Sequence, residues 1–189
     1  MDPLHPLETH SIRFPDGVYS DVRLERIADH QITLRDGHLD QVVTKVETGA
    51  LVRVLKGGRW YIASTTDLDA IDGVLAELAA SDALPPTDRP SGIAALEVID
   101  EAVWAFDDAR IDAVPVADKL ALLQHHARGL ERPSVRTWVA RWIDQHRDRR
   151  FVSSRGANVR HDYQECGFIL SVTMADGEST VSERFSRAD

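Results

Sequence analysis

The chain has 189 residues, 43% of them hydrophobic and 28% charged, with a formal net charge of -9. This size allows one domain or two small ones, each with its own core. The acidic balance argues against nucleic acid as a partner, because a phosphate backbone is bound by a basic surface. Cys166 is the only cysteine, so an internal disulfide is excluded and we expect a reducing, cytoplasmic location. No apolar run approaches the ~20 residues of a membrane-spanning helix, and no membrane partner is expected.

The first third of the chain is dominated by strand patterns. Residues 1–17 hold three of the eight prolines, and we predict an irregular N-terminal arm there, ahead of a domain spanning 18–189. From residue 19 to residue 64, apolar side chains recur at spacing two in short runs, which indicates half-buried strands. Ala28-Asp29-His30 is predicted to link two of these runs, and Gly49 to interrupt another. The Asp36-Gly37 and Gly57-Gly58 pairs are typical of tight turns, so this segment is predicted to be an antiparallel meander.

Two helices are predicted in the middle of the chain. Thr66 or Asp67 can cap a helix whose apolar residues continue at helical spacing to Leu78. A proline-rich link is predicted at about residues 81–92, because this segment contains Pro85, Pro86, Pro90 and Gly92, which interrupt helices and strands. Residues 93–114 are compatible with either a helix or a strand. Pro115 suits the first position of a second helix, which we expect to end near residue 129.

The last third of the chain returns to strand patterns. Residues 134–143 have apolar side chains at helical spacing but a composition that favours strands, so periodicity alone does not decide between the two. After them, short strands are predicted at hairpin intervals, with Asp176-Gly177 as a turn. Strands come in blocks and do not alternate with helices. The predicted fold class is therefore α+β, with antiparallel sheet blocks and helices packed on the sheet.

No catalytic motif of a common kind is found in the sequence. There is no H-E-x-x-H zinc helix, no phosphate-binding loop and no nucleophile elbow. His125 and His126 are adjacent on the second predicted helix, whereas helical metal ligands need a spacing of three or four residues. We therefore expect no catalytic residue and no metal ligand of a recognised pattern.

One polar cluster is a weak candidate site. His161, Glu165 and Cys166 could form a metal or nucleophilic site if the chain brought them together. The alternative is a polar turn or strand link beside a small thiol. An unrelated small enzyme using these three side chains is the least favoured of our functional hypotheses.

Several segments, taken in order, resemble a known family. They are the runs YSDVRLE (19–25), ITLRDG (32–37), GALVRVL (49–55), GRWYIAST (58–65), VADKLALL (116–123) and FVSSRGA (151–157). Together they are similar to the N-terminal domain of the TldD/PmbA metallopeptidases, once described as modulators of DNA gyrase. The resemblance covers roughly residues 18–186, and it favours a strand at 134–143. It departs from the family at residues 1–17, where a helix is usual.

The resemblance also carries functional expectations. Family members hold zinc in a C-terminal domain, in a HExxxH helix, and no position of this chain matches that helix. We therefore expect no cofactor in this chain, no peptidase activity by itself, and a family zinc site in a C-terminal domain that the chain lacks. The family acts on unfolded polypeptides as a dimer of related subunits. The leading hypothesis is a non-catalytic domain that serves substrate access or subunit assembly, with a polypeptide and a homo- or heterodimeric subunit as partners. The alternative is a stand-alone peptide- or protein-binding module with no peptidase role.

Overall fold

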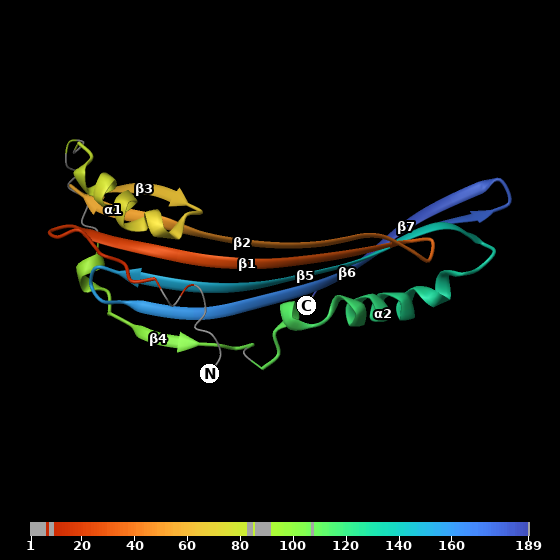
Figure 1. Cartoon of the computed structure of the whole chain (residues 1–189). Helices are drawn as coiled ribbons and strands as arrows, with labels where there is room; N and C mark the ends of the chain where they lie inside the picture. Colours follow the sequence, from red (N-terminus) through yellow and green to blue (C-terminus); the bar gives the residue numbers. More distant parts are fainter. Residues whose placement is uncertain (1–6, 8–9, 83–84, 86–91, 107, 189) are drawn as a thin grey trace. The chain divides into compact units, whose positions relative to one another are not determined.

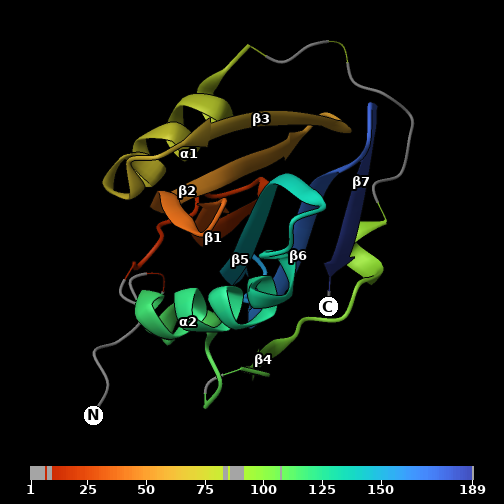
Figure 2. The same cartoon turned by 90° about the vertical axis from the view of Figure 1, so that its right-hand side faces the viewer.

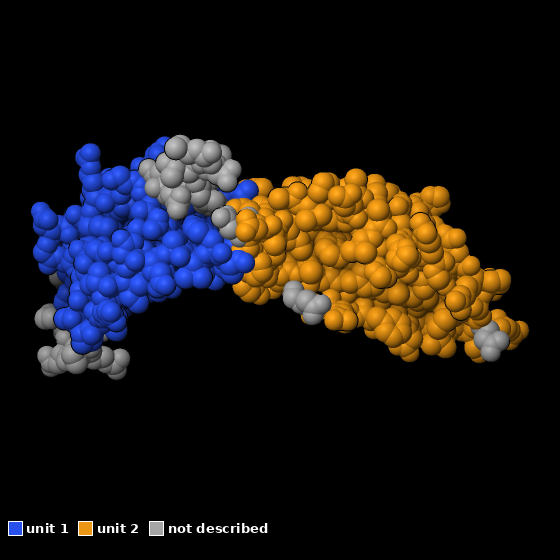
Figure 3. All heavy atoms as spheres, turned by 90° about the horizontal axis from the view of Figure 1, so that it is seen from below, with its two compact units in different colours: residues 1–26, 47–105, 148–162 blue, residues 27–46, 106–147, 163–189 orange. Residues whose placement is uncertain are grey.

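The structure is a computed structural model that describes residue 7, residues 10–82, residue 85, residues 92–106 and residues 108–188. Its residues divide into two compact units, which Figure 3 distinguishes by colour. Unit 1 comprises residues 1–26, 47–105 and 148–162, and unit 2 comprises residues 27–46, 106–147 and 163–189. Strands and helices together confirm the α+β class (Figure 1).

Seven strands are found among the described residues, and they belong to one sheet in the order β3-β2-β1-β5-β6-β4, with β7 also paired with β6. Their bounds are β1 Tyr19–Arg35, β2 His38–Lys56, β3 Arg59–Thr65, β4 Asp100–Val103, β5 Val135–Ser153, β6 Asn158–Asp176 and β7 Ser179–Ala188. The β2–β3 and β6–β7 pairs are antiparallel. The short β4 is an exception to the predicted antiparallel pattern, since it pairs in parallel with β6.

Unit 1 is built around helix α1 (Ile71–Ala80). Asp67, one of the two predicted caps, accepts a hydrogen bond from the backbone of Asp69 and caps the short 3-10 turn that leads into α1. Ile71 and Leu75 of α1 are fully buried against the strands, as Figure 1 shows for α1 beside β3. The core also contains Leu7, Val22, Leu24, Ala50, Val52, Val54 and Val152.

Unit 2 is built around helix α2 (Val116–Ala127). Pro115 is the N-cap of the helix, one residue before the first helical position that was predicted for it, and its missing N–H costs nothing at a helix start. In Figures 1 and 2, α2 lies along one face of the strands. Leu123 and Ala127 of the helix share a buried core with Ile32, Leu34, Trp138, Ala140 and Val172.

The strands are longer than the sequence patterns predicted. Ala28-Asp29-His30 was expected to separate two strands, and Gly49 to interrupt a third, yet both lie inside continuous strands. Ala28 and His30 are buried, so these residues face protein rather than solvent and need not turn. Residues 161–166 were likewise expected in a turn or strand link, and they lie inside β6.

Three segments bear on the remaining sequence predictions. Residues 135–143 are part of β5, so the strand prediction is confirmed over the helical spacing. In the arm, residues 10–17 form no helix or strand, while the other residues except Leu7 lie outside the described part of the chain. Most of the proline-rich link also lies outside the described residues.

Candidate functional site

The three predicted site residues do not meet in one place. His161 lies in the part of β6 that belongs to unit 1, where it pairs with Val103 of β4. Glu165 and Cys166 lie in unit 2. As neighbours in an extended strand, these two side chains point to opposite faces of the sheet. The Glu165 carboxylate accepts a hydrogen bond from the Tyr163 hydroxyl at 3.0 Å.

The histidine pair of α2 is equally unsuited to chelation. The rings of His125 and His126 lie edge to face with centroids 5.4 Å apart, and His126 also contacts the Phe168 ring. Among the described residues, no group of three or more histidine, cysteine or acidic side chains is arranged to hold a metal ion. No helix of the described chain is long and apolar enough to cross a membrane.

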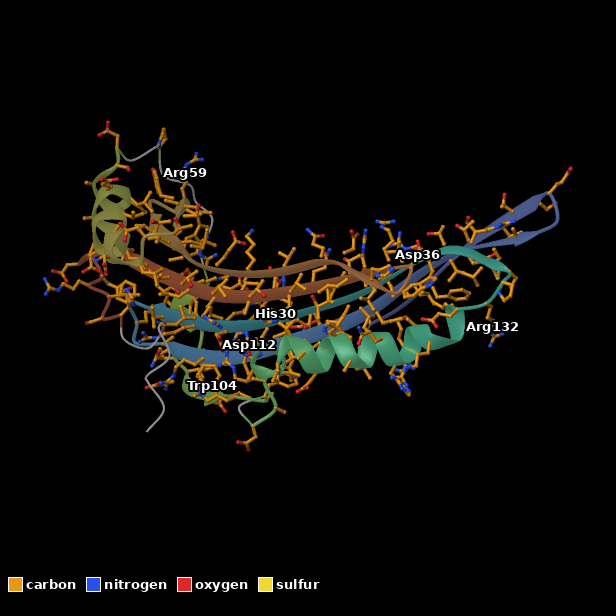
Figure 4. The ribbon with its side chains drawn as sticks, turned by 45° about the vertical axis from the view of Figure 1, so that its right-hand side comes forward. His30, Asp36, Arg59, Trp104, Asp112 and Arg132 are labelled. Carbon is orange, nitrogen blue, oxygen red and sulfur yellow. The ribbon has the colours of Figure 1, made fainter. Side chains whose placement is uncertain are left out.

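A buried polar network joins α2 to the sheet in unit 2. Lys119 is 2% exposed and Asp144 is 1% exposed, and the Lys119 Nζ lies 2.7 Å from the Asp144 Oδ2. The His30 Nδ1 lies 2.9 Å from the Asp144 Oδ1 and 3.1 Å from the Lys119 Nζ. Trp142 completes the network, since its Nε1 donates to the Asp144 Oδ2 at 2.6 Å. Figure 4 labels His30 on the strands that run beside α2, the green helix.

The burial of this network determines what it can do. A buried carboxylate is tolerated when paired charges and hydrogen bonds satisfy it, and Asp144 has three such partners. The same enclosure keeps the Lys119 and Asp144 side chains from reaching a substrate. The arrangement therefore serves to set the position of α2 on the sheet.

A cavity of about 560 Å³ lies beside α2 in unit 2. Its volume is in the range of small-molecule pockets. Most of the lining side chains are apolar; the lining comprises Leu122, Leu123, His126, Trp142, Cys166, Gly167, Phe168, Leu170 and Arg187. The cavity can hold an apolar group, and it explains the half-buried position of Cys166.

An edge of the sheet is exposed in unit 2. β3 pairs only with residues 50–56 of β2, so residues 38–46 of β2 extend beyond it. All nine of these residues are exposed. Four of them are large apolar residues that occupy both faces of the strand, namely Leu39, Val42, Val43 and Val46. We call residues 38–46 the β2 edge segment.

A second polar cluster lies in unit 1. The buried Asp21 carboxylate accepts two hydrogen bonds from the Arg53 guanidinium, each of 2.8 Å. That guanidinium also stacks over the Trp60 ring, 4.4 Å from its centroid, and Tyr19 packs edge-on against the same ring. Hydrogen bonding to Asp21 raises the pKa of Arg53. Burial, and then the charge of Asp21, raise the pKa of Tyr19. These contacts tie β1 to β2.

The sequence search missed the Lys119 network, although one signal for it existed. Lys119 lies four residues before Leu123 and eight before Ala127, so it shares their buried helical face. A lysine on the buried apolar face of a helix needs a buried hydrogen-bond acceptor, because its charge is otherwise costly to remove from water. Asp144 is buried on β5, on the strand face that also carries Trp138 and Ala140 at even spacing.

Comparison with known proteins supports a family relation. Residues 20–83 match the family model described as PmbA/TldA metallopeptidase domain 1. No curated protein matches the sequence.

The described fold also has counterparts among solved structures. It is similar to a putative modulator of DNA gyrase from Thermotoga maritima, with a TM-score of 0.66 and 14% identity over 92% of this chain and 40% of the other. For a putative modulator of DNA gyrase from Bacteroides thetaiotaomicron, the TM-score is 0.65 at 15% identity, over 90% of this chain and 40% of the other. For TldE from Thermococcus kodakarensis, it is 0.59 at 11% identity, over 90% of this chain and 39% of the other.

The chain thus spans about two fifths of the length of the solved structures it matches. At these identities the likeness concerns the fold alone. The resemblance drawn from the sequence motifs is confirmed to this extent: residues 20–83 are similar to the first domain of the PmbA/TldD metallopeptidases, and the fold is shared with solved structures described as modulators of DNA gyrase.

Proposed function

We propose that this chain is a non-catalytic domain that holds an extended polypeptide at the β2 edge segment and so assists substrate access in a TldD/PmbA-type peptidase. The observation that carries the proposal is the exposure of residues 38–46 along the edge of the sheet. An extended polypeptide can add to such an edge as a further strand.

The chemistry of the edge suits an unfolded substrate. Main-chain hydrogen bonds between strands do not depend on the side chains of the incoming peptide, so one edge accepts many sequences. Leu39 and Val43 lie on one face and Val42 and Val46 on the other. Apolar side chains of the bound polypeptide can therefore make contacts on either face of the sheet. Natural proteins protect long apolar edges from such pairing, which makes this exposed segment a candidate binding surface.

In this proposal, catalysis belongs to another part of the peptidase and not to this chain. The described residues offer no metal-binding group, and the candidate residues His161, Glu165 and Cys166 do not converge. The purified chain is expected to bind no stoichiometric zinc and to cleave no unfolded peptide. One tightly bound zinc per chain, measured by metal analysis, would contradict this assignment.

The binding proposal is tested with a fluorescently labelled, reduced and carboxymethylated polypeptide, whose binding is followed by anisotropy. A chain with both Val42→Lys and Val43→Lys places a charge on each face of the edge. We expect it to bind at least about tenfold more weakly, because lysines on an edge oppose strand addition. Both positions are exposed, so the circular dichroism spectrum should not change.

The matched control is Val114→Lys. Val114 is also exposed and belongs to unit 2, but it lies outside the strands. Its substitution should leave the affinity for the polypeptide unchanged. Equal binding by the control and by the doubly substituted chain would overturn the proposal. The alternative function, a stand-alone binding module, would have no peptidase subunit as its partner. Co-purification of this chain with a zinc-bearing subunit therefore favours the peptidase role.

A further inference from the structure

The cavity beside α2 is enclosed by four elements of unit 2. The helix α2 and the strands β5, β6 and β7 each contribute residues to its lining, and Figure 2 shows the helix together with these strands. Its volume of about 560 Å³ lies within the range of small-molecule pockets, ~300–1,000 Å³. The side chains on its wall therefore decide which ligand it fits.

Three large side chains on this wall are only partly buried although they pack against the core of unit 2. They are Trp142, Phe168 and Leu170. Phe168 and Leu170 stand on the same face of β6 as Val172, which is buried in that core. Each of the three thus contacts the core on one side and borders the cavity on the other. An apolar molecule in the cavity would remove the remaining surface from water, which is favourable in proportion to the area covered.

The cavity opens to solvent along α2. Leu122 lines it and is 44% exposed, whereas the next residue, Leu123, lines it and is fully buried. His126 lies four residues after Leu122, on the same side of the helix, and it is also exposed and part of the lining. Leu122 and His126 therefore mark the mouth of the cavity, and Leu123 marks its inner wall. A ligand can enter there without a change in the fold.

Rings on the wall favour an aromatic ligand. The rings of His126 and Phe168 already pack edge to face, with centroids 6.2 Å apart. The indole N–H of Trp142 donates to the Asp144 Oδ2 at 2.6 Å, so it is engaged on the protein and the ring offers the ligand its carbon surface. Aromatic rings prefer stacked or edge-on neighbours, and such contacts add to the gain from burial alone.

The lining does not provide for a charged ligand. None of the described residues that line the cavity is acidic, so a bound cation would lack a counter-ion there. Arg187 belongs to the lining, but it has an interaction of its own within the protein, and we assign it no role in binding. Burying a charge without a partner is costly. We propose that the cavity beside α2 binds a small, uncharged aromatic molecule.

This site is separate from the proposed polypeptide-binding edge. In the sheet, β1 and β5 lie between β2 and β6, so the β2 edge segment does not reach the strands that wall the cavity. The two binding events are therefore independent. An excess of the carboxymethylated polypeptide should leave the aromatic ligand bound, and displacement by the polypeptide would overturn a separate site.

The probe for this site is N-phenylnaphthylamine, an uncharged aromatic dye whose fluorescence rises in apolar surroundings. Titration into the full 189-residue chain should saturate at one dye per chain, and naphthalene should displace the dye. Naphthoate adds a carboxylate to the same rings and should compete at least about tenfold less well. Decalin, the saturated counterpart of naphthalene, should also compete more weakly. Equal competition by naphthoate or by decalin would overturn the assigned ligand class, and a dye that does not saturate would overturn the site.

Cys166 provides a matched pair of variants inside the cavity. It lines the cavity two residues before Phe168, on the same face of β6. Cys166→Phe places a ring in the cavity and should weaken dye binding at least about tenfold, because the ring takes up the space of the ligand. Cys166→Ser changes the size of the side chain little and should bind the dye as the unaltered chain does. Equal binding by the phenylalanine and serine variants would contradict the proposed position of the ligand.

A second pair of variants tests the mouth of the cavity without altering a buried position. Leu122→Asp places a carboxylate there and should weaken dye binding at least about tenfold, because a bound apolar molecule would strip water from the charge. Leu39→Asp is the control, since Leu39 is 52% exposed and belongs to unit 2 but does not line the cavity. It should leave dye binding unchanged. Equal losses in both variants, with unchanged circular dichroism spectra, would mean that the dye binds exposed apolar surface in general and would overturn the proposal.

Discussion

Removal of the buried lysine should destabilise unit 2 strongly. Lys119→Met keeps most of the volume of the side chain and removes its charge from the Asp144 Oδ2, which lies 2.7 Å away. The Asp144 side chain is fully buried, so water cannot replace the lost partner. Breaking a buried ion pair from one side costs about 3–5 kcal/mol. His30 and the Trp142 indole still bond the carboxylate, so we expect a loss near 3 kcal/mol, the lower end of that range.

The assay is urea denaturation followed by circular dichroism and by tryptophan fluorescence. Two of the four tryptophans, Trp138 and Trp142, belong to unit 2, so the fluorescence signal includes the unit that is perturbed. Because the chain has two compact units, the two signals are compared before a single free energy of unfolding is assigned. Lys45→Met is the control, since the contacts of an exposed lysine contribute little and their loss should change stability by no more than about 1 kcal/mol.

A double-mutant cycle tests whether the two side chains act as a pair. Asp144→Asn should be less harmful when Lys119 is already methionine, and the two losses should fall short of additivity by at least about 1 kcal/mol. A loss below about 1 kcal/mol for Lys119→Met, or full additivity in the cycle, would refute the role of this network in anchoring α2.

Three further outcomes follow from the packing, the turns and the pKa directions. Leu123→Ala empties a fully buried position in unit 2 and should cost about 2–5 kcal/mol in the same denaturation assay; a smaller loss would mean that the neighbouring side chains collapse into the space. Gly37→Ala introduces a side chain at a φ of 83° and should cost about 1 kcal/mol, whereas an unchanged midpoint would contradict strain at this turn. Burial and Asp21 raise the pKa of Tyr19. The free energy of unfolding should therefore fall as pH rises above about 10, because Tyr19 ionises in the unfolded chain while it stays protonated in the folded protein. Thermal melts should show a weaker fall for Tyr19→Phe, and equal falls would contradict the assigned cause.

Much of the fold could be predicted from local sequence because it depends on local backbone chemistry. Asp36, Gly37, Gly57, Gly58 and Gly177 all have positive φ, as the predicted turns require. Asp67 and Pro115 begin their helices for reasons confined to one helical turn. These features act over a few residues, and a pattern of residue types is enough to reveal them.

Strand length and strand partners depended on contacts far apart in the sequence. Residues 28–30 contain no strong strand former and were predicted to form a link. Burial of His30 against Asp144 and Lys119 keeps them in β1, and these partners lie 114 and 89 residues away. No local pattern contains that information.

The candidate sites divide in the same way. The sequence alone determined that no recognised catalytic motif is present and that the motifs resemble those of a TldD/PmbA first domain. Tertiary structure decided that His161, Glu165 and Cys166 do not converge, that the β2 edge segment is an exposed edge, and that a cavity lies beside α2. The reason is physical: a motif depends on the order of residues, whereas an edge exists only where the neighbouring strand ends and a cavity only where packed elements leave space. Both are determined by pairing and packing across the whole sheet.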